Sequence, residues 1–341
     1  MADPKFVHLH NHTDYSLLDG ACHIPKMMQV AAQHEWPAIA ITDHGNLFGA
    51  VDFYQAAKKV GIKPIIGCEV YVARGSHTEK NEQGGYHHLL LLCKNETGYR
   101  NLMKLVSTGY LDGFYYKPRI DKDLLAQHSE GLICTSACLA GDLAEALVEK
   151  EDYELGKKLA YEYSDIFGKE NFFIEIQDHG LDLDKKFLPQ LHRLSQETGI
   201  PLVATNDAHY LTKDDARAHE ALLCVQTGKT LSDPNRMRFE TDHFYLKTED
   251  EMIEILGGDK QPLWRTWEIA EQCNLDINPV GNPFPEFGVP EEHTIDTYFE
   301  YVARQGLEKR RAHLEYQRDK GLLRHDIKEY YERLELRRQA S

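Results

Sequence analysis

The sequence predicts an α/β fold in which alternating strands and helices close into a barrel. Short runs of β-branched and apolar residues alternate with longer segments whose apolar residues recur at helical spacing, as in parallel strands joined by helical crossovers. Residues that can bind metals follow nearly every predicted strand, and active sites of such barrels are built at the carboxyl ends of the strands. An open doubly wound sheet would bind its ligand at one crevice instead. Ligand-type residues at almost every strand end therefore favour closure.

Seven strands are expected, each a short run rich in β-branched or other apolar residues. They span residues 6–13, 38–42, 64–72, 87–93, 131–135, 172–177 and 201–205. Helices are expected between them, and two carry end signals: Pro25 suits a first helical turn, and Gly61 suits a helix stop. The helical segments are 25–36, 50–60, 98–110, 142–149, 153–167 and 184–198.

The pattern changes after about residue 211, where the alternation of strands and helices ends. Helices are expected at 214–225, 248–256 and 266–273, so that a barrel with helical additions occupies residues 1–275. Residues 276–293 are rich in proline and glycine, which is typical of a linker. Residues 294–341 are charged and helical in pattern, which predicts a C-terminal helical extension cut from a longer protein.

Composition narrows the function classes. The formal net charge of −16 argues against broad electrostatic binding to DNA or to anionic membranes, although bound cations could offset this field at one site. No apolar run is long enough to cross a bilayer, so no membrane partner is expected. Seven cysteines without a CxxC pair indicate a reducing compartment, and we expect a cytoplasmic protein.

The first predicted strand carries a row of imidazoles. Phe6, His8, His10 and His12 would share one face, because side chains alternate sides along a strand. Neutral imidazole is the commonest metal-binding side chain, so this face resembles a metal platform more than a core. The alternative interpretation is a polar strand end that is hydrogen-bonded to its neighbours.

The other strand ends supply nitrogen, carboxylate and thiolate candidates in the same manner. More than four candidates converge, which exceeds a single tetrahedral zinc site and favours two or three metals that share a carboxylate. Taken singly, several have plain alternatives: a turn at Asp19, a lysine partner for Glu69, a buried role for Cys138. Either His87 or His88 must point away from the cavity. The candidates are His10, His12, Asp19, His44, Glu69, His87 or His88, Cys138, Asp207 and His209.

Several segments resemble a known family in the right order. The segments FVHLHNHT (6–13), YSLLDG (15–20), TDHGN (42–46) and NDAH (206–209) are similar to those of PHP (polymerase and histidinol phosphatase) domains in bacterial DNA polymerase III alpha subunits. The resemblance runs over essentially the whole chain. It implies a distorted seven-stranded barrel with a trinuclear site for divalent metals. It also implies that the metal-binding and catalytic residues are His10, His12, Asp19, His44, Glu69, His88, Cys138, Asp207 and His209, with His88 chosen over His87.

The resemblance further implies a metal-dependent 3′→5′ exonuclease that could proofread, because every ligand position keeps a residue able to bind metal. Zinc is favoured by the thiolate, with manganese or iron as alternatives. Lys117, Arg119 and Tyr115 are expected to contact the DNA 3′ end, against the alternative of a solvated loop. Expected partners are the polymerase region of the same subunit and other replisome subunits. Competing functions are a small-molecule phosphomonoesterase and a metal-stabilised structural module.

Overall fold

The computed structural model describes residues 5–17, 19–80, 85–278, 287–330 and 332–333. It contains two compact units, Met1–Ile277 and Asn278–Ser341. Residues 279–286 of the predicted linker and residues 331 and 334–341 of the predicted tail lie outside the described residues. The second unit is built around α11 (Ile295–Asp319), whose first turn is capped by the Thr294 hydroxyl.

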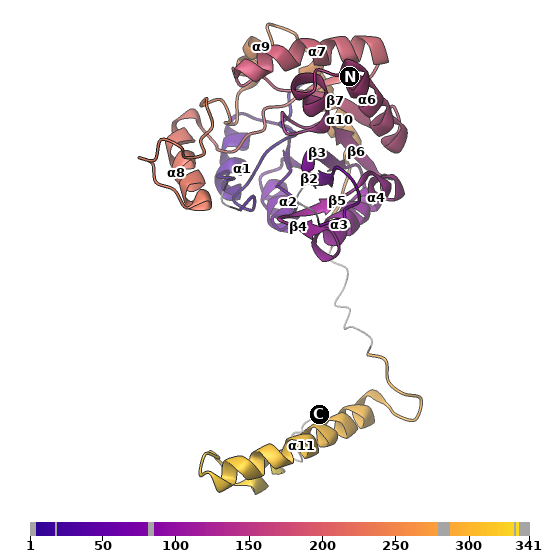
Figure 1. The fold of residues 1–341 in the computed structure, drawn as a ribbon, viewed down its shortest axis with the longest axis vertical. Helices are drawn as coiled ribbons and strands as arrows, with labels where there is room; N and C mark the ends of the chain where they lie inside the picture. The colour runs from indigo at the N-terminus through magenta and orange to yellow at the C-terminus, as the bar shows by residue number, and fades with distance from the viewer. Residues whose placement is uncertain (1–4, 18, 81–84, 279–286, 331, 334–341) are drawn as a thin grey trace. The chain divides into compact units, whose positions relative to one another are not determined.

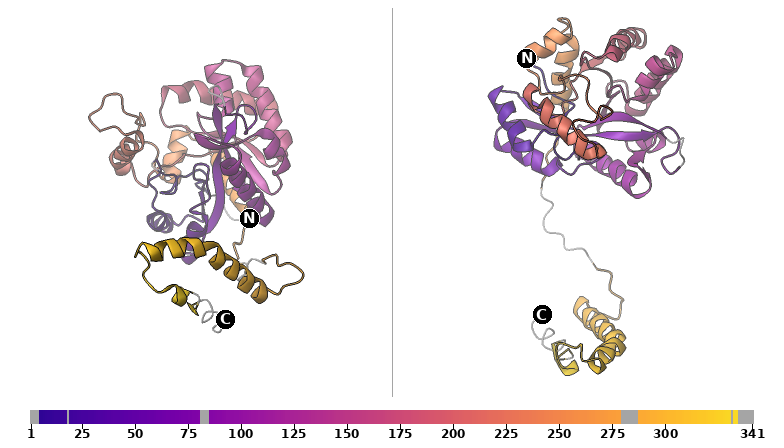
Figure 2. Two further views of the ribbon diagram at one scale, coloured as in Figure 1. Left: turned by 60° about the horizontal axis from the view of Figure 1, so that its bottom comes forward. Right: turned by 60° about the vertical axis from the view of Figure 1, so that its left-hand side comes forward.

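The first unit holds a curled sheet (Figures 1 and 2), and its strands follow the predicted ones closely. Neighbouring strands run in the order β1–β2–β3–β6–β7–β8. These strands are β1 (Ala38–Ile41), β2 (Lys63–Ala73), β3 (Tyr86–Cys93), β6 (Leu132–Thr135), β7 (Phe172–Ile176) and β8 (Leu202–Ala204).

The segment at residues 6–13 completes the ring, but it is not the regular strand that was predicted. It forms isolated parallel bridges, His8 with Ile39 beside β1 and Asn11 with Ala208 beyond β8. The backbone oxygen of His8 accepts from the Ala40 N–H at 2.9 Å and also from the Asn11 side chain at 3.1 Å, and the bridges on the two sides stay isolated. The predicted closure therefore depends on backbone bonds such as His12 N to Ala208 O, at 2.8 Å.

The expectation of parallel strands throughout is wrong at β3, which runs antiparallel to both β2 and β6. Its first residues therefore reach the same end of the barrel as the carboxyl ends of its neighbours. The sequence also gave no sign of a hairpin, β4 (Phe114–Tyr115) and β5 (Lys117–Ile120), which joins the end of β2. Strands this short, with Pro118 inside one of them, leave no alternation to detect.

Helices cover the outside of the barrel (Figure 1), mostly where the sequence predicts them. The predicted helix at 142–149 is a short α5 (Asp142–Ala144) that continues as a π-helical turn, η1 (Glu145–Glu149). The predicted helix at 214–225 begins with the 3₁₀ turn η2 (Lys213–Asp215). The remaining helices are α1 (Ile24–Gln33), α2 (Ala50–Lys59), α3 (Glu96–Leu111), α4 (Lys122–Gln127), α6 (Tyr153–Phe167), α7 (Asp182–Thr198), α8 (Ala216–Thr227), α9 (Glu249–Ile255) and α10 (Gln261–Gln272).

Alternating residues of the barrel divide between two apolar cores. In β1, Ile39 and Ile41 face the core under the outer helices, whereas Ala38 and Ala40 face the inner one. The inner core also receives Ile269 from α10 and residues from each strand of the ring. Its other members are Val7, Leu9, Ile65, Leu92, Ile133, Phe173, Val203, Ala270 and Cys273. An apolar plug thus fills one part of the barrel interior, and the polar strand ends lie beyond it.

Among the described helices, none is both long and apolar enough to cross a membrane. All seven cysteines lie in the described part of the chain, and all are free thiols.

Candidate metal centre

The nine predicted ligands come together at one end of the barrel, around the carboxylates of Glu69 and Asp207. His88 opens β3 yet reaches this end because β3 is antiparallel to its neighbours. His10 and His12 come from the closing segment, and Glu69 lies within β2. The remaining ligands follow β1, β6 and β8 or lie in the turn at Asp19. The structure thus gathers these side chains, and their role as metal ligands remains a prediction.

Glu69 lies at the centre of the cluster and is almost fully buried. Its Oε1 lies 2.9 Å from Nδ1 of His88 and 3.5 Å from Nε2 of His10. Its Oε2 lies 2.6 Å from Nδ1 of His44 and 3.6 Å from Nε2 of His12. Cys138 Sγ approaches Oε1 at 3.8 Å. One carboxylate therefore adjoins five of the other predicted ligands, as a carboxylate shared between metals would.

Asp207 forms a second centre beside the first. Its Oδ1 lies 2.9 Å from Nε2 of His12, 3.4 Å from Nε2 of His10 and 3.5 Å from Nδ1 of His209. Asp207 has a φ of +46°, a conformation that costs a non-glycine residue about 1 kcal/mol or more. On the other side of the cluster, Asp19 Oδ2 lies 3.5 Å from Nε2 of His44.

Many of these atoms are buried without a hydrogen bond, which is the observation that best fits bound cations. A buried polar atom without a partner is costly, so a group of them facing one another calls for something between them. Within the described residues, such atoms in this cluster are His10 Nε2, His12 Nε2, Asp19 Oδ1, His44 Nδ1, Glu69 Oε2 and Asp207 Oδ1.

The same side chains fall into overlapping groups with metal-ligand spacing. In each group the ligand atoms all lie within 4.8 Å of one another. His12, Glu69 and His44 each belong to two groups, so neighbouring cation positions would share ligands. In the part of the chain that the structure describes, the groups are His12–His44–His209, His10–His12–Glu69 and His44–Glu69–His88.

The cluster holds its carboxylates in the charged form. Burial acts to raise the pKa of Glu69, but the imidazoles of His88 and His44 hold it well below its usual range. Burial likewise opposes ionisation of Asp207, whose pKa His10 and His209 nevertheless keep well below normal. Burial raises the pKa of the Cys138 thiol, and the nearby Glu69 adds to the effect. A thiolate at this position would therefore need a cation beside it.

The buried carboxylate of Glu175, which is not among the predicted ligands, orients His10. Glu175 Oε1 lies 2.7 Å from Nδ1 of His10 and accepts a hydrogen bond from the Thr205 hydroxyl, while its Oε2 accepts one from the Thr135 hydroxyl. This bond directs the other ring nitrogen, Nε2, toward Glu69 and Asp207. The available signal was a lone acidic residue in the middle of an apolar strand.

Ser16 supports His12 in a similar way. The Ser16 hydroxyl lies 3.1 Å from Nδ1 of His12 and donates to Oδ1 of Asp43 at 2.8 Å. Asp43 also accepts from the Thr13 backbone N–H and hydroxyl. Asp43 therefore lies where it can act on His12 through Ser16.

His8 departs from the row of imidazoles expected on the first strand. Its Nε2 lies 2.8 Å from the backbone oxygen of Lys247, and its ring packs against Phe6 and Trp36. Burial lowers the pKa of His8 to about 4. His8 is therefore a neutral core residue, and the prediction that it shares a face with His10 and His12 is wrong.

Of the predicted DNA contacts, the structure keeps Lys117 near the centre and buries Arg119. Lys117 Nζ lies 5.2 Å above the Tyr71 ring, and that ring lies 5.2 Å from the ring of His88. The Arg119 guanidinium instead donates to the backbone oxygens of Glu79 and Gly113. This position corrects its expected role, because a buried side chain that is bound to the backbone has no path to a phosphate. Arg119 also lies under the Tyr115 ring, at 5.2 Å.

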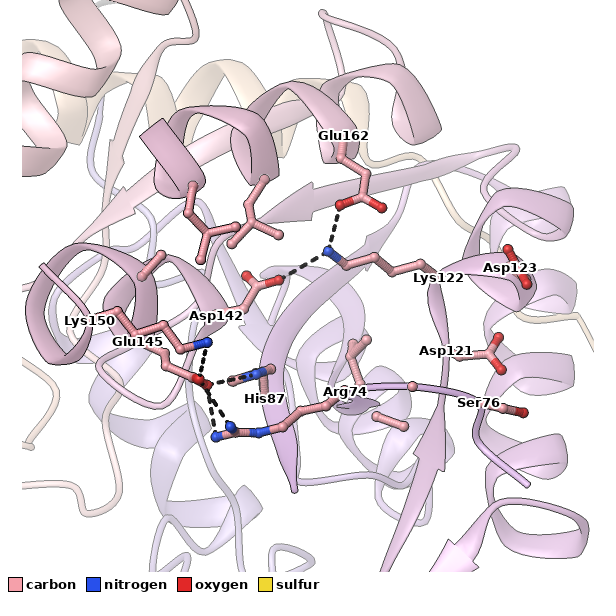
Figure 3. A pocket seen from close by; sticks show the side chains of 16 residues that line it. Arg74, Ser76, His87, Asp121, Lys122, Asp123, Asp142, Glu145, Lys150 and Glu162 are labelled. Carbon is pink, nitrogen blue, oxygen red and sulfur yellow. Dashed lines mark hydrogen bonds and ion pairs between the residues drawn. The ribbon is translucent and has the colours of Figure 1, made fainter. Parts of the chain in front are cut away.

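His87 points to the opposite face of β3, into a cavity of about 430 Å³ beside η1 (Figure 3). There its Nε2 lies 3.0 Å from Glu145, which also pairs with Arg74 and Lys150. The ambiguity between His87 and His88 is thus resolved by geometry, with His88 alone facing Glu69.

The barrel, with its histidine and carboxylate cluster at the strand ends, defines a protein with a candidate polynuclear metal site. The PHP domain family model matches residues 8–179, about half of the chain. The chain belongs to the PHP family, as its sequence motifs suggested.

Curated relatives resemble this chain beyond the residues that the family model matches. The chain is 46% identical over 316 residues to DNA polymerase III subunit alpha of Treponema pallidum, and 45% identical over 320 residues to that of Thermus aquaticus. These matches cover 92% and 90% of this chain. The chain spans only about a quarter of the length of these relatives, 27% and 26%.

Solved structures resemble it more distantly. An amidohydrolase from Chromobacterium violaceum aligns with a TM-score of 0.40 at 16% identity, over 63% of this chain and 96% of that one. A two-domain protein from Bacteroides vulgatus, which contains a predicted PHP-like metal-dependent phosphoesterase, aligns with a TM-score of 0.40 at 15% identity. That alignment covers 66% of this chain and 56% of the other.

Proposed function

We propose that the cluster binds three divalent metal ions and hydrolyses the terminal phosphodiester at the 3′ end of DNA. The ligands would be His10, His12, Asp19, His44, Glu69, His88, Cys138, Asp207 and His209. The observation that carries this proposal is the set of buried, facing atoms without hydrogen bonds around Glu69 and Asp207. Zinc is the favoured metal because of the thiol, with manganese or iron as alternatives.

The proposed hydrolysis requires few side chains besides the metal ligands. Bound divalent ions would lower the pKa of a water molecule and stabilise charge on the phosphoryl oxygens. Glu69 and Asp207 supply fixed negative charge between the imidazoles, so that cations are held at the strand ends. Glu175 fixes the orientation of His10, and Lys117 is placed to attract a phosphate beside His88. No side-chain nucleophile is required.

The relatives support a role in DNA replication. They are DNA polymerase III alpha subunits, so we place this chain in a larger polymerase whose replicative region delivers the 3′ end to the barrel for proofreading. Its partners would then be that polymerase region and other replisome subunits, in the cytoplasm. The net charge of −16 agrees with delivery by an attached partner, since the domain alone would attract DNA weakly.

The test compares a 3′-labelled oligonucleotide with histidinol phosphate in the presence of zinc, manganese or iron. We expect release of the labelled nucleotide from the 3′ end, and loss of that activity in Asp19→Asn and His44→Ala. Phosphate release from histidinol phosphate alone would identify a phosphomonoesterase instead. If chelation lowers the melting temperature but no metal supports hydrolysis of either substrate, the centre is a structural module.

A further inference from the structure

A row of exposed aromatic rings lies on the loop after β1, the end of α3 and the β4–β5 hairpin. The Phe48 ring centroid lies 6.1 Å from that of Tyr110, which in turn stacks on Phe114 at 6.2 Å. The exposed fractions of these side chains are 58%, 39% and 47%. Soluble proteins rarely leave neighbouring large apolar side chains in water unless the surface binds something. We call Phe48, Tyr110 and Phe114 the aromatic row.

The aromatic row begins on the same loop as one of the candidate ligands. Asn46 Nδ2 donates to the backbone oxygen of His44 at 3.0 Å, and the Phe48 N–H donates to Oδ1 of Asn46 at 3.0 Å. The Asn46 side chain thus fixes the position of Phe48 relative to His44. A group that stacks on Phe48 is therefore a short loop away from the metal centre.

The hairpin end of the row also contacts this loop. Gly45 has a φ of +62°, and a Cβ there would lie 2.8 Å from Tyr71 and 2.9 Å from Pro118 of β5. Pro118 is the strand partner of Phe114. The neighbouring Lys117 places its ammonium above Tyr71, which borders the centre. A cation and an aromatic surface therefore lie together beside the ligand loop.

Tyr116, at the tip of the hairpin, has a backbone conformation that destabilises the fold, which suggests that its side chain has a function. Its φ is +60°, although glycine or asparagine suits that conformation and other residues lose about 1–2 kcal/mol in it. Its side chain is 80% exposed, and its ring contacts that of Tyr115 edge-on at 4.6 Å. An exposed ring in a strained position contributes little to folding.

The exposed rings, together with the charge of the chain, favour one occupant. A net charge of −16 disfavours binding along a duplex, whose affinity comes mainly from its phosphates. Unpaired bases can instead stack on aromatic rings, and every base offers such a face. We propose that the aromatic row and Tyr116 stack the bases of a single-stranded 3′ end, while Lys117 attracts its phosphate. This inference rests on the proposed phosphodiesterase function, which supplies the reason for a 3′ end at this position.

The test measures fluorescence anisotropy of the whole chain with a labelled oligo-dT whose 3′-terminal linkages are phosphorothioates, in the presence of metal. We expect Phe48→Ser and Phe114→Ser each to raise Kd at least about fivefold, the lower range for loss of one stacked base. Tyr116→Gly should raise Kd without lowering the melting temperature, because glycine removes the strain. The matched control is Tyr161→Ser, an exposed aromatic on α6, which should leave Kd unchanged.

Unchanged Kd in Phe48→Ser and Phe114→Ser overturns the inference and leaves the row for another occupant, such as a protein. Equal wild-type affinity for a blunt duplex also overturns it, because a duplex offers no free base faces. The proposed function is tested separately by hydrolysis of a 3′-labelled strand. If nothing is hydrolysed but the variants still lose affinity for oligo-dT, the proposed phosphodiesterase function is wrong and the proposed binding surface for single strands is supported.

Discussion

Nδ1 of His44 lies 2.6 Å from Oε2 of Glu69, yet neither atom makes a hydrogen bond. Glu69 is buried and ionised, with His10, His12, His44 and His88 around it. Such a cluster carries unsatisfied charge and lone pairs that water cannot reach, so its stability depends on what fills it. We therefore expect metal binding and folding of the barrel to be linked.

Removal of metal should therefore destabilise the chain. A ligand that binds only the folded state stabilises it by about 4 kcal/mol at a thousand times its Kd, so EDTA should lower the melting temperature by at least about 5 °C. Differential scanning calorimetry before and after EDTA, and after zinc or manganese is restored, measures this. The control is Glu145→Gln, in the cavity of Figure 3, whose melting temperature should fall on EDTA treatment by as much as that of the wild type. An unchanged transition would contradict linkage between metal and fold.

Adjacent residues of β3 provide a matched pair. His88 faces Glu69, whereas His87 faces Glu145 across the strand. His88→Gln should reduce the bound metal by about one equivalent and suppress hydrolysis, because a ligand of one of the candidate groups is lost. His87→Gln should keep the wild-type metal content. Elemental analysis of both purified variants measures their metal content. Equal metal loss in the two would show that disturbance of β3, rather than loss of a ligand, causes the decrease.

The sequence predicted the strands of the ring and the gathering of their polar ends with good accuracy. Apolar runs of four to eight residues identify strands, and the strand ends bear His44, Asp207 and His209 where a barrel needs them. The direction of β3 was not predictable, because an apolar run reads alike in either direction. Its reversal explains why His88 lies at the start of its strand and still reaches the centre.

Residues that act through other residues were also missed. Glu175 and Ser16 are ordinary in sequence, and only the folded barrel brings them to His10 and His12. Arg119 was misjudged for the opposite reason. Its charge predicted exposure, but backbone oxygens from two loops bury it completely. Tertiary hydrogen bonds of this kind have no periodic signal along the chain.

Acid should weaken the fold through His179. Burial lowers its pKa to about 4, its Nε2 lies 2.9 Å from the backbone oxygen of Asn206, and its ring stacks on Phe244. In the unfolded chain His179 binds a proton below about pH 6.5, whereas in the folded chain it stays neutral down to about pH 4. The free energy of unfolding therefore falls as the pH drops through this window.

The free energy of unfolding in urea should show this effect between pH 7.5 and pH 5. Relative to His179→Gln, the wild type should lose about 2 kcal/mol over that interval, from the separation of the two pKa values. Changes that come from the metal centre are common to both proteins and cancel in the difference. Parallel pH profiles for the two proteins would show that His179 does not contribute.

Lys247 should influence the metal centre without touching it. It is fully buried, and its Nζ donates to Oδ1 of Asn206 at 2.7 Å and to the backbone oxygen of His243. Asn206 Nδ2 donates to the same oxygen and to that of Tyr245, at 2.9 and 2.7 Å. This network includes the residue before Asp207, which has a positive φ, and we expect the network to help maintain that conformation.

Lys247→Met keeps most of the side-chain volume but leaves Asn206 without its donor. Because groups that orient a ligand typically contribute about 10–100-fold to metal affinity, the variant should bind zinc at least about tenfold more weakly. Titration calorimetry measures the affinity, and Lys213→Met, at a half-exposed lysine paired with Asp242, is the control. A buried unpaired acceptor should also lower the free energy of unfolding by about 1–3 kcal/mol. If the free energy of unfolding falls while zinc affinity stays at the wild-type value, Lys247 supports only the fold. The conformation of Asp207 would then be maintained by the backbone hydrogen bonds between Ala208 and the closing segment.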